Sequence, residues 1–248
     1  CDFGVIVRTN AAGASTEHIL AELEDLKREL EETIRRGRFN PCFTKIKEGS
    51  DFVTNAMKNV YWDALDHIVT DDEKIYKKIL EYTNKMNPKP GCEVKLYQDP
   101  LLPLYKLYRL EHGLEEALDE KVWLKSGGFL IIQQTEAFVA IDVNSGKYMS
   151  KKKADEEYKK INLEAAKEIA RQLRLRNLYG MILIDFINMN QYEDRSELIR
   201  AMKNFVRDDR ITTTVVDVTA LGIMELTRKK EEKSIREQVT EVTGGDGR

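Results

Sequence analysis

The sequence predicts a mixed α/β fold (α+β), in which helices pack against a sheet. Between residues 118 and 218, apolar runs of strand length alternate with amphipathic helical patterns. A long amphipathic helix is also predicted near the start of the chain. With 248 residues, 42% hydrophobic and 33% charged, the protein is long enough to bury a substantial core. We therefore expect a soluble globular protein of one to three compact units.

The first predicted elements are a short strand over residues 3–9 and, after a turn at residues 11–15, a long helix. Ser15 is the candidate N-cap and Gly37 the expected end of this helix. Its apolar stripe covers only about two heptads, so packing on a small sheet is favoured over a coiled coil. Arg8 and Thr9 end the strand; a guanidinium and a hydroxyl can bind phosphate, although such a pair is usually plain surface.

The next region, residues 40–117, carries weaker signals. A helix is predicted over residues 72–86, a proline-rich loop follows it, and a short strand is predicted over residues 94–97.

From residue 118 onward the pattern is sharper. A hairpin is predicted with arms at residues 129–132 and 137–143, after a Gly-Gly turn. The order then continues with a helix whose candidate N-cap is Asn162, a strand too apolar to be half exposed, a second helix and a last strand. These elements are expected at residues 162–176, 181–187, 197–206 and 211–218.

Composition excludes several classes of protein. The three cysteines are widely spaced, which argues against a disulfide framework and a zinc motif, and the three histidines show no ligand spacing. Cysteine usage of this kind suits a reducing cytoplasm, where we expect the protein, and no long apolar span or signal-like start is seen. The net charge of −3 does not decide for or against nucleic acid, because local basic patches matter more than the total.

Two aspartates, Asp142 and Asp185, interrupt otherwise apolar strand-like runs. An ionised carboxylate in such a setting needs a pair, hydrogen bonds or a cation. Asn144 stands two residues after Asp142, so both side chains lie on one face of an extended chain. Each aspartate alone could be a solvated strand end. The two together with Asn144 favour a shared hard cation, magnesium or alternatively manganese.

Basic residues flank these aspartates in sequence, and Lys147, Lys151 and Arg171 are candidate contacts to a single-stranded nucleic acid. Tyr148 among the lysines is compatible with base stacking beside phosphate contacts. A solvated helix face remains the alternative for each charge run. The same alternative applies to residues 225–230, where acids surround the basic residues.

Several motifs in a fixed order resemble the ribonuclease E/G family. They are Val122-Trp-Leu-Lys-Ser-Gly-Gly-Phe129, Gln134-Thr-Glu-Ala137, Ile141-Asp-Val-Asn-Ser-Gly146, Asn162-Leu-Glu-Ala-Ala166, Ile169-Ala-Arg-Gln-Leu-Arg-Leu-Arg176 and Ile184-Asp-Phe-Ile187. The start, Val5-Ile-Val-Arg-Thr9, resembles the family's 5′-sensor segment, which extends the resemblance to most of the chain.

The resemblance implies an endoribonuclease that cleaves single-stranded RNA in RNA processing and decay. Asp142 and Asp185 match the magnesium ligands and Asn144 the supporting amide, while Arg8 and Thr9 match the pocket that senses a 5′-monophosphate. The family layout implies a 5′-sensor at residues 1–53 and a ribonuclease H-like remnant at 54–117. A DNase I-like catalytic subdomain would follow at 118–240, and a flexible tail at 241–248.

The sequence also departs from the family pattern. No S1-type RNA-binding domain is recognised, so a fragment or trimmed form is expected. Asn188 stands where a further aspartate is common. Thr240 and Thr243 replace the paired cysteines of the family's zinc link, so no zinc is expected and a homodimer, if formed, would lack that link. The alternatives are a non-catalytic RNA-binding or scaffolding relative, and a metal-dependent phosphodiesterase acting on DNA.

Overall fold

The computed structural model of the protein describes residues 3–7, 16–47, 52–58, 65–86, 92–146, 154–207 and 209–244. The chain divides into two compact units, Cys1–Leu107 and Tyr108–Arg248. Helices and strands are mixed in both units, which confirms the predicted fold class. The finer division at residues 53, 117 and 240 stays a prediction.

The first unit contains a two-stranded parallel sheet and several helices. The helices and strands are α1 (Thr16–Phe39), α2 (Phe52–Lys58), β1 (His67–Thr70), α3 (Glu73–Met86), β2 (Glu93–Leu96) and α4 (Leu104–Leu107). The predicted helix at 72–86 and strand at 94–97 are therefore confirmed. Asp72 caps α3, and the backbone N–H groups of Ile75 and Lys74 lower the pKa of its carboxyl group.

The start of the chain differs from the prediction. Residues 3–7 are exposed and form no strand, because the structure gives this segment no hydrogen-bonded neighbouring strand within its described residues. Helix α1 is confirmed, but it continues through Gly37 to Phe39. Leu26 on its apolar stripe is 53% exposed, so the expected packing of this stripe on a sheet is not seen there. Ser15 lies outside the described residues.

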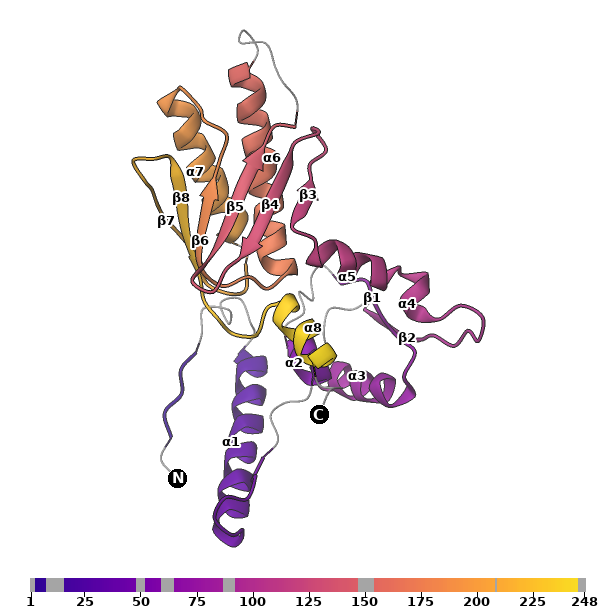
Figure 1. Cartoon of the computed structure of the whole chain (residues 1–248). Coiled ribbons are helices and arrows are strands. Elements are labelled where there is room, and N and C mark those ends of the chain that lie inside the picture. Colours follow the sequence, from indigo (N-terminus) through magenta and orange to yellow (C-terminus); the bar gives the residue numbers. More distant parts are fainter. Residues whose placement is uncertain are drawn as a thin grey trace. The chain divides into compact units, whose positions relative to one another are not determined.

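The second unit is built on a six-stranded sheet with the strand order β3-β4-β5-β6-β8-β7 (Figure 1). Strands β5 and β6 run parallel, joined by α6, and the other neighbouring pairs are antiparallel. The elements are α5 (Leu110–Leu118), β3 (Lys121–Trp123), β4 (Phe129–Gln134), β5 (Phe138–Asn144), α6 (Ala154–Leu175), β6 (Gly180–Asp185), α7 (Tyr192–Arg207), β7 (Thr213–Val218), β8 (Ile223–Arg228) and α8 (Ile235–Gly244).

Helices α6 and α7 cover one face of this sheet (Figure 1). Alternate residues of the strands point into the resulting core, as Val139, Ile141 and Val143 do on β5. The intervening residues lie on the opposite face, which we call the open face. The prediction that the strand at 181–187 is buried on both sides is wrong, because Met181 on the open face of β6 is 55% exposed. The helices also begin earlier than predicted, at Ala154 and Tyr192.

For residues 225–230 the sequence left a basic strip and a solvated helix as alternatives, but residues 225–228 belong to strand β8 (Ile223–Arg228) in the interior of the sheet. Its last residue, Arg228, has a side chain that is 3% exposed and forms an ion pair of 2.8 Å with the equally buried Asp209. The guanidinium also donates to Asn177 Oδ1 and to the Leu178 carbonyl. A charge was expected to stay in solvent; here a complete set of partners allows its burial.

Two further features concern the helices. Lys159 on α6 forms ion pairs of 2.7 and 2.8 Å with Asp194 and Glu197 on α7, and these carboxylates raise its pKa. Helix α8 includes residues 241–244 of the segment predicted to be a flexible tail. In the part of the chain that is described, no helix is both long and apolar enough to span a membrane.

Candidate active site

The two predicted aspartates lie side by side on the open face of the sheet. Asp142 of β5 and Asp185 of β6 are direct partners in the parallel register, so their α-carbons lie about 4.8 Å apart. Both residues are exposed. Like charges placed directly opposite each other on neighbouring strands repel, and a cation bound between them would offset that repulsion. The arrangement therefore has the character of a cation site.

Asn144 extends the site along β5. It lies two residues beyond Asp142 on the same face, and its Nδ2 donates a hydrogen bond of 2.7 Å to Asp142 Oδ2. This bond restrains the rotation of the carboxylate and leaves its other oxygen, Oδ1, available as a ligand. The structure thus brings these three residues together, and their role as a metal site stays a prediction.

The end of β5 is held by close backbone packing against the turn between β3 and β4. Gly146 has a φ of +69°, and a Cβ at this position would collide with the Gly127 carbonyl. A Cβ on Gly128 would lie 2.7 Å from the Asn144 carbonyl oxygen. Glycine is therefore required at both places, and their contact fixes the position of the strand end that carries the site.

Glu164 of α6 also holds this turn. Its carboxylate accepts hydrogen bonds of 2.7 and 3.2 Å from the backbone N–H groups of Lys125 and Ser126. Sequence reasoning did not assign this role, because the two partners lie almost 40 residues away in the chain.

Asn162 holds the loop that follows Asp185. Its Nδ2 donates to the Ile187 carbonyl at 2.7 Å, and its Oδ1 accepts from the Ile187 N–H at 3.1 Å. The prediction that Asn162 caps a helix is wrong, because the residue lies within α6 and is fully buried. A signal was present: Asn162 falls on the apolar stripe formed by Ala166, Ile169 and Leu173.

The donor set fits a hard divalent cation held largely by water. Two exposed carboxylates and a nearby amide offer oxygen ligands, and magnesium usually keeps several waters beside one or two protein carboxylates. Within the described ranges, no cluster of three or more His, Cys, Asp or Glu side chains forms a more complete metal cage. Asp142, Asp185 and Asn144 are therefore the residues that could hold such an ion.

Five of the other predicted site residues, Arg8, Thr9, Lys147, Tyr148 and Lys151, lie outside the described residues.

Arg171 lies on α6, which covers the opposite face of the sheet, and pairs with Glu168 at 2.8 Å. Its role in RNA contact stays a prediction. Asn188 is exposed in the loop after β6, close to the turn at Gly222.

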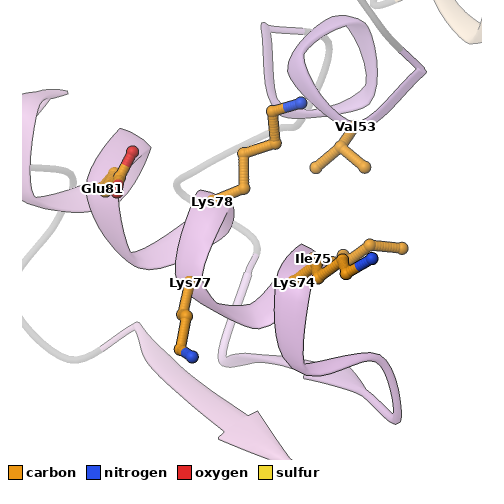
Figure 2. A pocket seen from close by; sticks show the side chains of 6 residues that line it. All are labelled: Val53, Lys74, Ile75, Lys77, Lys78 and Glu81. Atoms are coloured by element: carbon orange, nitrogen blue, oxygen red, sulfur yellow. The ribbon is translucent and has the colours of Figure 1, made fainter.

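A separate hollow lies in the first unit between α2 and α3, where Lys78 extends from α3 toward the helix that carries Val53 (Figure 2). Three lysines line it, but Lys77 is paired with Glu73 at 2.7 Å and its pKa is raised by that contact. The hollow contains no pair of carboxylates, and we assign it no function.

Comparison with known proteins agrees with the resemblance seen in the motifs. The model of the Ribonuclease E/G family matches residues 1–231. A protein named Ribonuclease G from Haemophilus influenzae is 34% identical over 232 residues, which are 94% of this chain and 47% of that protein. Ribonuclease G from Escherichia coli K12 gives the same values. A Ribonuclease E from Nostoc sp. is 33% identical over 237 residues, 94% of this chain and 34% of that protein. The chain thus spans about half the length of these relatives, or less.

Proposed function

The chain belongs to the ribonuclease E/G family, and on this premise we propose that it is a magnesium-dependent endoribonuclease that cleaves single-stranded RNA. The observation that carries the proposal is the direct pairing of Asp142 with Asp185 on neighbouring parallel strands. Two carboxylates placed directly opposite each other repel, and a shared cation accounts for their placement together. Manganese is an alternative ion because it favours the same oxygen ligands.

Asp142 and Asp185 would hold the ion, and Asn144 keeps the Asp142 carboxylate in the orientation that its 2.7 Å hydrogen bond defines. When bound, the ion would supply a Lewis acid that neutralises charge on the phosphate and lowers the pKa of a water. The water oxygen forms a bond to phosphorus and the bond from phosphorus to the 3′-oxygen breaks. The proton lost by the water balances the proton gained by the leaving oxygen, so the products end in a 5′-phosphate and a 3′-hydroxyl.

The test compares cleavage of a short single-stranded RNA bearing a 5′-monophosphate in magnesium and in chelator. Asp142→Asn and Asp185→Asn should each abolish cleavage while RNA binding survives, and each should weaken Mn²⁺ binding measured by electron paramagnetic resonance. Asp217→Asn is the matched control, since Asp217 is an exposed aspartate on β7 outside the pair. Full activity in either site variant would overturn the assignment. Binding without cleavage by the unaltered chain would favour a scaffolding relative, and equal cleavage of DNA a general phosphodiesterase.

We further propose that Arg8 and Thr9 sense the 5′-monophosphate, a role supported by the match of the first residues to the family. Arg8→Ala should reduce the ratio of cleavage of 5′-phosphorylated RNA to cleavage of 5′-hydroxyl RNA without changing cleavage of the latter. Arg38→Ala, which removes an exposed arginine from the end of α1, should leave that ratio unchanged. An unchanged ratio in Arg8→Ala would refute the sensor role.

A further inference from the structure

An aromatic pair stands beside the carboxylates on the open face. Trp123 of β3 and Phe129 of β4 meet edge to face, with ring centroids 5.4 Å apart. The ammonium group of Lys121 lies over both rings, 3.9 Å from the Trp123 centroid and 4.0 Å from the Phe129 centroid. Trp123 nevertheless remains 65% exposed. The indole is thus held in place by its neighbours while much of its surface is open to a ligand.

The sheet register connects this pair to the candidate active site. Trp123 is the partner of Phe129, and Phe129 is the partner of Asn144. The neighbouring row runs from Lys121 through Ile131 to Asp142. Directly paired residues share a face, and two strand spacings place the α-carbon of Trp123 about 10 Å from that of Asn144. The aromatic pair and the carboxylates therefore form one continuous surface.

We propose that Trp123, supported by Phe129 and Lys121, is a stacking platform for an unpaired base of the RNA. This base would lie close to the phosphate that is cleaved at Asp142 and Asp185. The inference rests on the proposed function and deepens it. Every base has a π-face, so an indole accepts single-stranded RNA without reading its sequence, and a duplex hides these faces. Lys121 adds a positive charge beside the platform, where a phosphate of the same strand would pass.

The first test uses tryptophan fluorescence. The chain has two tryptophans, and Trp62→Phe leaves Trp123 as the reporter. In a Trp62→Phe, Asp142→Asn protein in chelator, a single-stranded oligonucleotide should quench the emission and a duplex of the same sequence should not. Trp123→Ala should weaken binding of the single strand about 10-fold, the effect expected for loss of one stacked base. Trp123→Phe should restore most of it.

The second test locates the base. A series of 5′-phosphorylated RNAs, each with one abasic position near the cleavage site, is cleaved by the unaltered protein. One abasic position should lower kcat/KM about 10-fold, and Trp123→Ala should lower it equally on intact RNA, with no further loss when both changes are combined. Met181→Ala is the control, because Met181 is an exposed apolar residue at the far end of the same face. It should retain the sensitivity to the abasic position.

The outcomes separate this inference from the proposed function. One outcome is that the unaltered chain cleaves RNA, the single strand does not quench Trp123, and the Trp123→Ala variant equals the unaltered chain in binding and in kcat/KM. The platform is then refuted and the nuclease stands. If the single strand quenches Trp123 but the unaltered chain does not cleave, the platform stands and the nuclease is refuted. Equal quenching by duplex and single strand refutes base stacking. Neither quenching nor cleavage refutes both.

Discussion

Replacing Asn162 by leucine should destabilise the second unit by about 2–4 kcal/mol. Asn162 is fully buried and makes two hydrogen bonds with the backbone of Ile187, at 2.7 and 3.1 Å. Leucine has nearly the same size but neither donor nor acceptor, so the Ile187 N–H and C=O lose their partners. Each unpaired buried group costs about 1–3 kcal/mol. Two such groups would together cost about 2–6 kcal/mol. Because Ile187 is only partly buried and water can reach it, we expect a cost in the lower part of that range.

The assay is urea unfolding followed by circular dichroism, combined with amide hydrogen exchange. The unfolding midpoint should fall, and the loop at residues 186–191 should exchange faster than in the unaltered protein. Asn190→Leu is the matched control: Asn190 lies in the same loop, but it is exposed and its amide contacts only Asp155. We expect its effect to stay within about 0.5 kcal/mol. An unchanged midpoint and unchanged loop exchange in Asn162→Leu would refute the reasoning.

Three other changes probe the supports of the fold. Asp209→Asn should destabilise the second unit by about 3–5 kcal/mol, because it leaves the Arg228 charge buried without its counter-ion; a change below about 1 kcal/mol in urea unfolding would contradict this. Gly146→Ala should weaken Mn²⁺ binding and leave the circular dichroism spectrum unchanged, because the end of β5 must shift to relieve the collision of the new Cβ. Gly113→Ala is the control: the space around Gly113 is open, so Mn²⁺ binding should be unchanged. Glu237 forms a capping box with Ser234, and its pKa is lowered below the ordinary 4.5, first by the Ser234 N–H and then by the Tyr179 hydroxyl. Its ionised form therefore stabilises the fold above about pH 4.5, and this contribution is lost as the pH falls through the lowered pKa. Glu237→Gln should flatten that part of the curve of stability against pH, and an unaltered curve would refute the assignment.

The features that could be predicted depend on residues close together in the sequence. An aspartate within an apolar run is easily recognised as unusual. The two-residue spacing places Asn144 on the same face as Asp142, as the structure confirms. The register that sets Asp142 opposite Asp185 was not predictable by spacing, since 43 residues and a crossover helix separate them. A shared cation could still be inferred from the two carboxylates together with Asn144, and the resemblance to the family implied the same pair as metal ligands.

The features that were missed depend on distant partners. Residues 223–228 mix acidic, basic and apolar side chains, a composition equally typical of a solvated helix. The strand forms because Met224 and Leu226 face the core and Asp209 neutralises Arg228. Asn162 similarly matched the rule for helix caps, whereas its actual partner, Ile187, belongs to a loop 25 residues away. A local rule cannot identify a partner that only the tertiary fold supplies.

One face of the six-stranded sheet packs in the hydrophobic core, and the opposite face carries the candidate site. On the covered face, β5 contributes Val139, Ile141 and Val143 to the core, and their burial fixes the register of the strand. A shift by one residue would turn Asp142 into that core, at the cost of burying an ionised carboxylate. The alternation of apolar residues along β5 therefore keeps Asp142 on the open face. The site can then tolerate the repulsion between Asp142 and Asp185, because the energy that aligns them comes from the opposite side of the same strands.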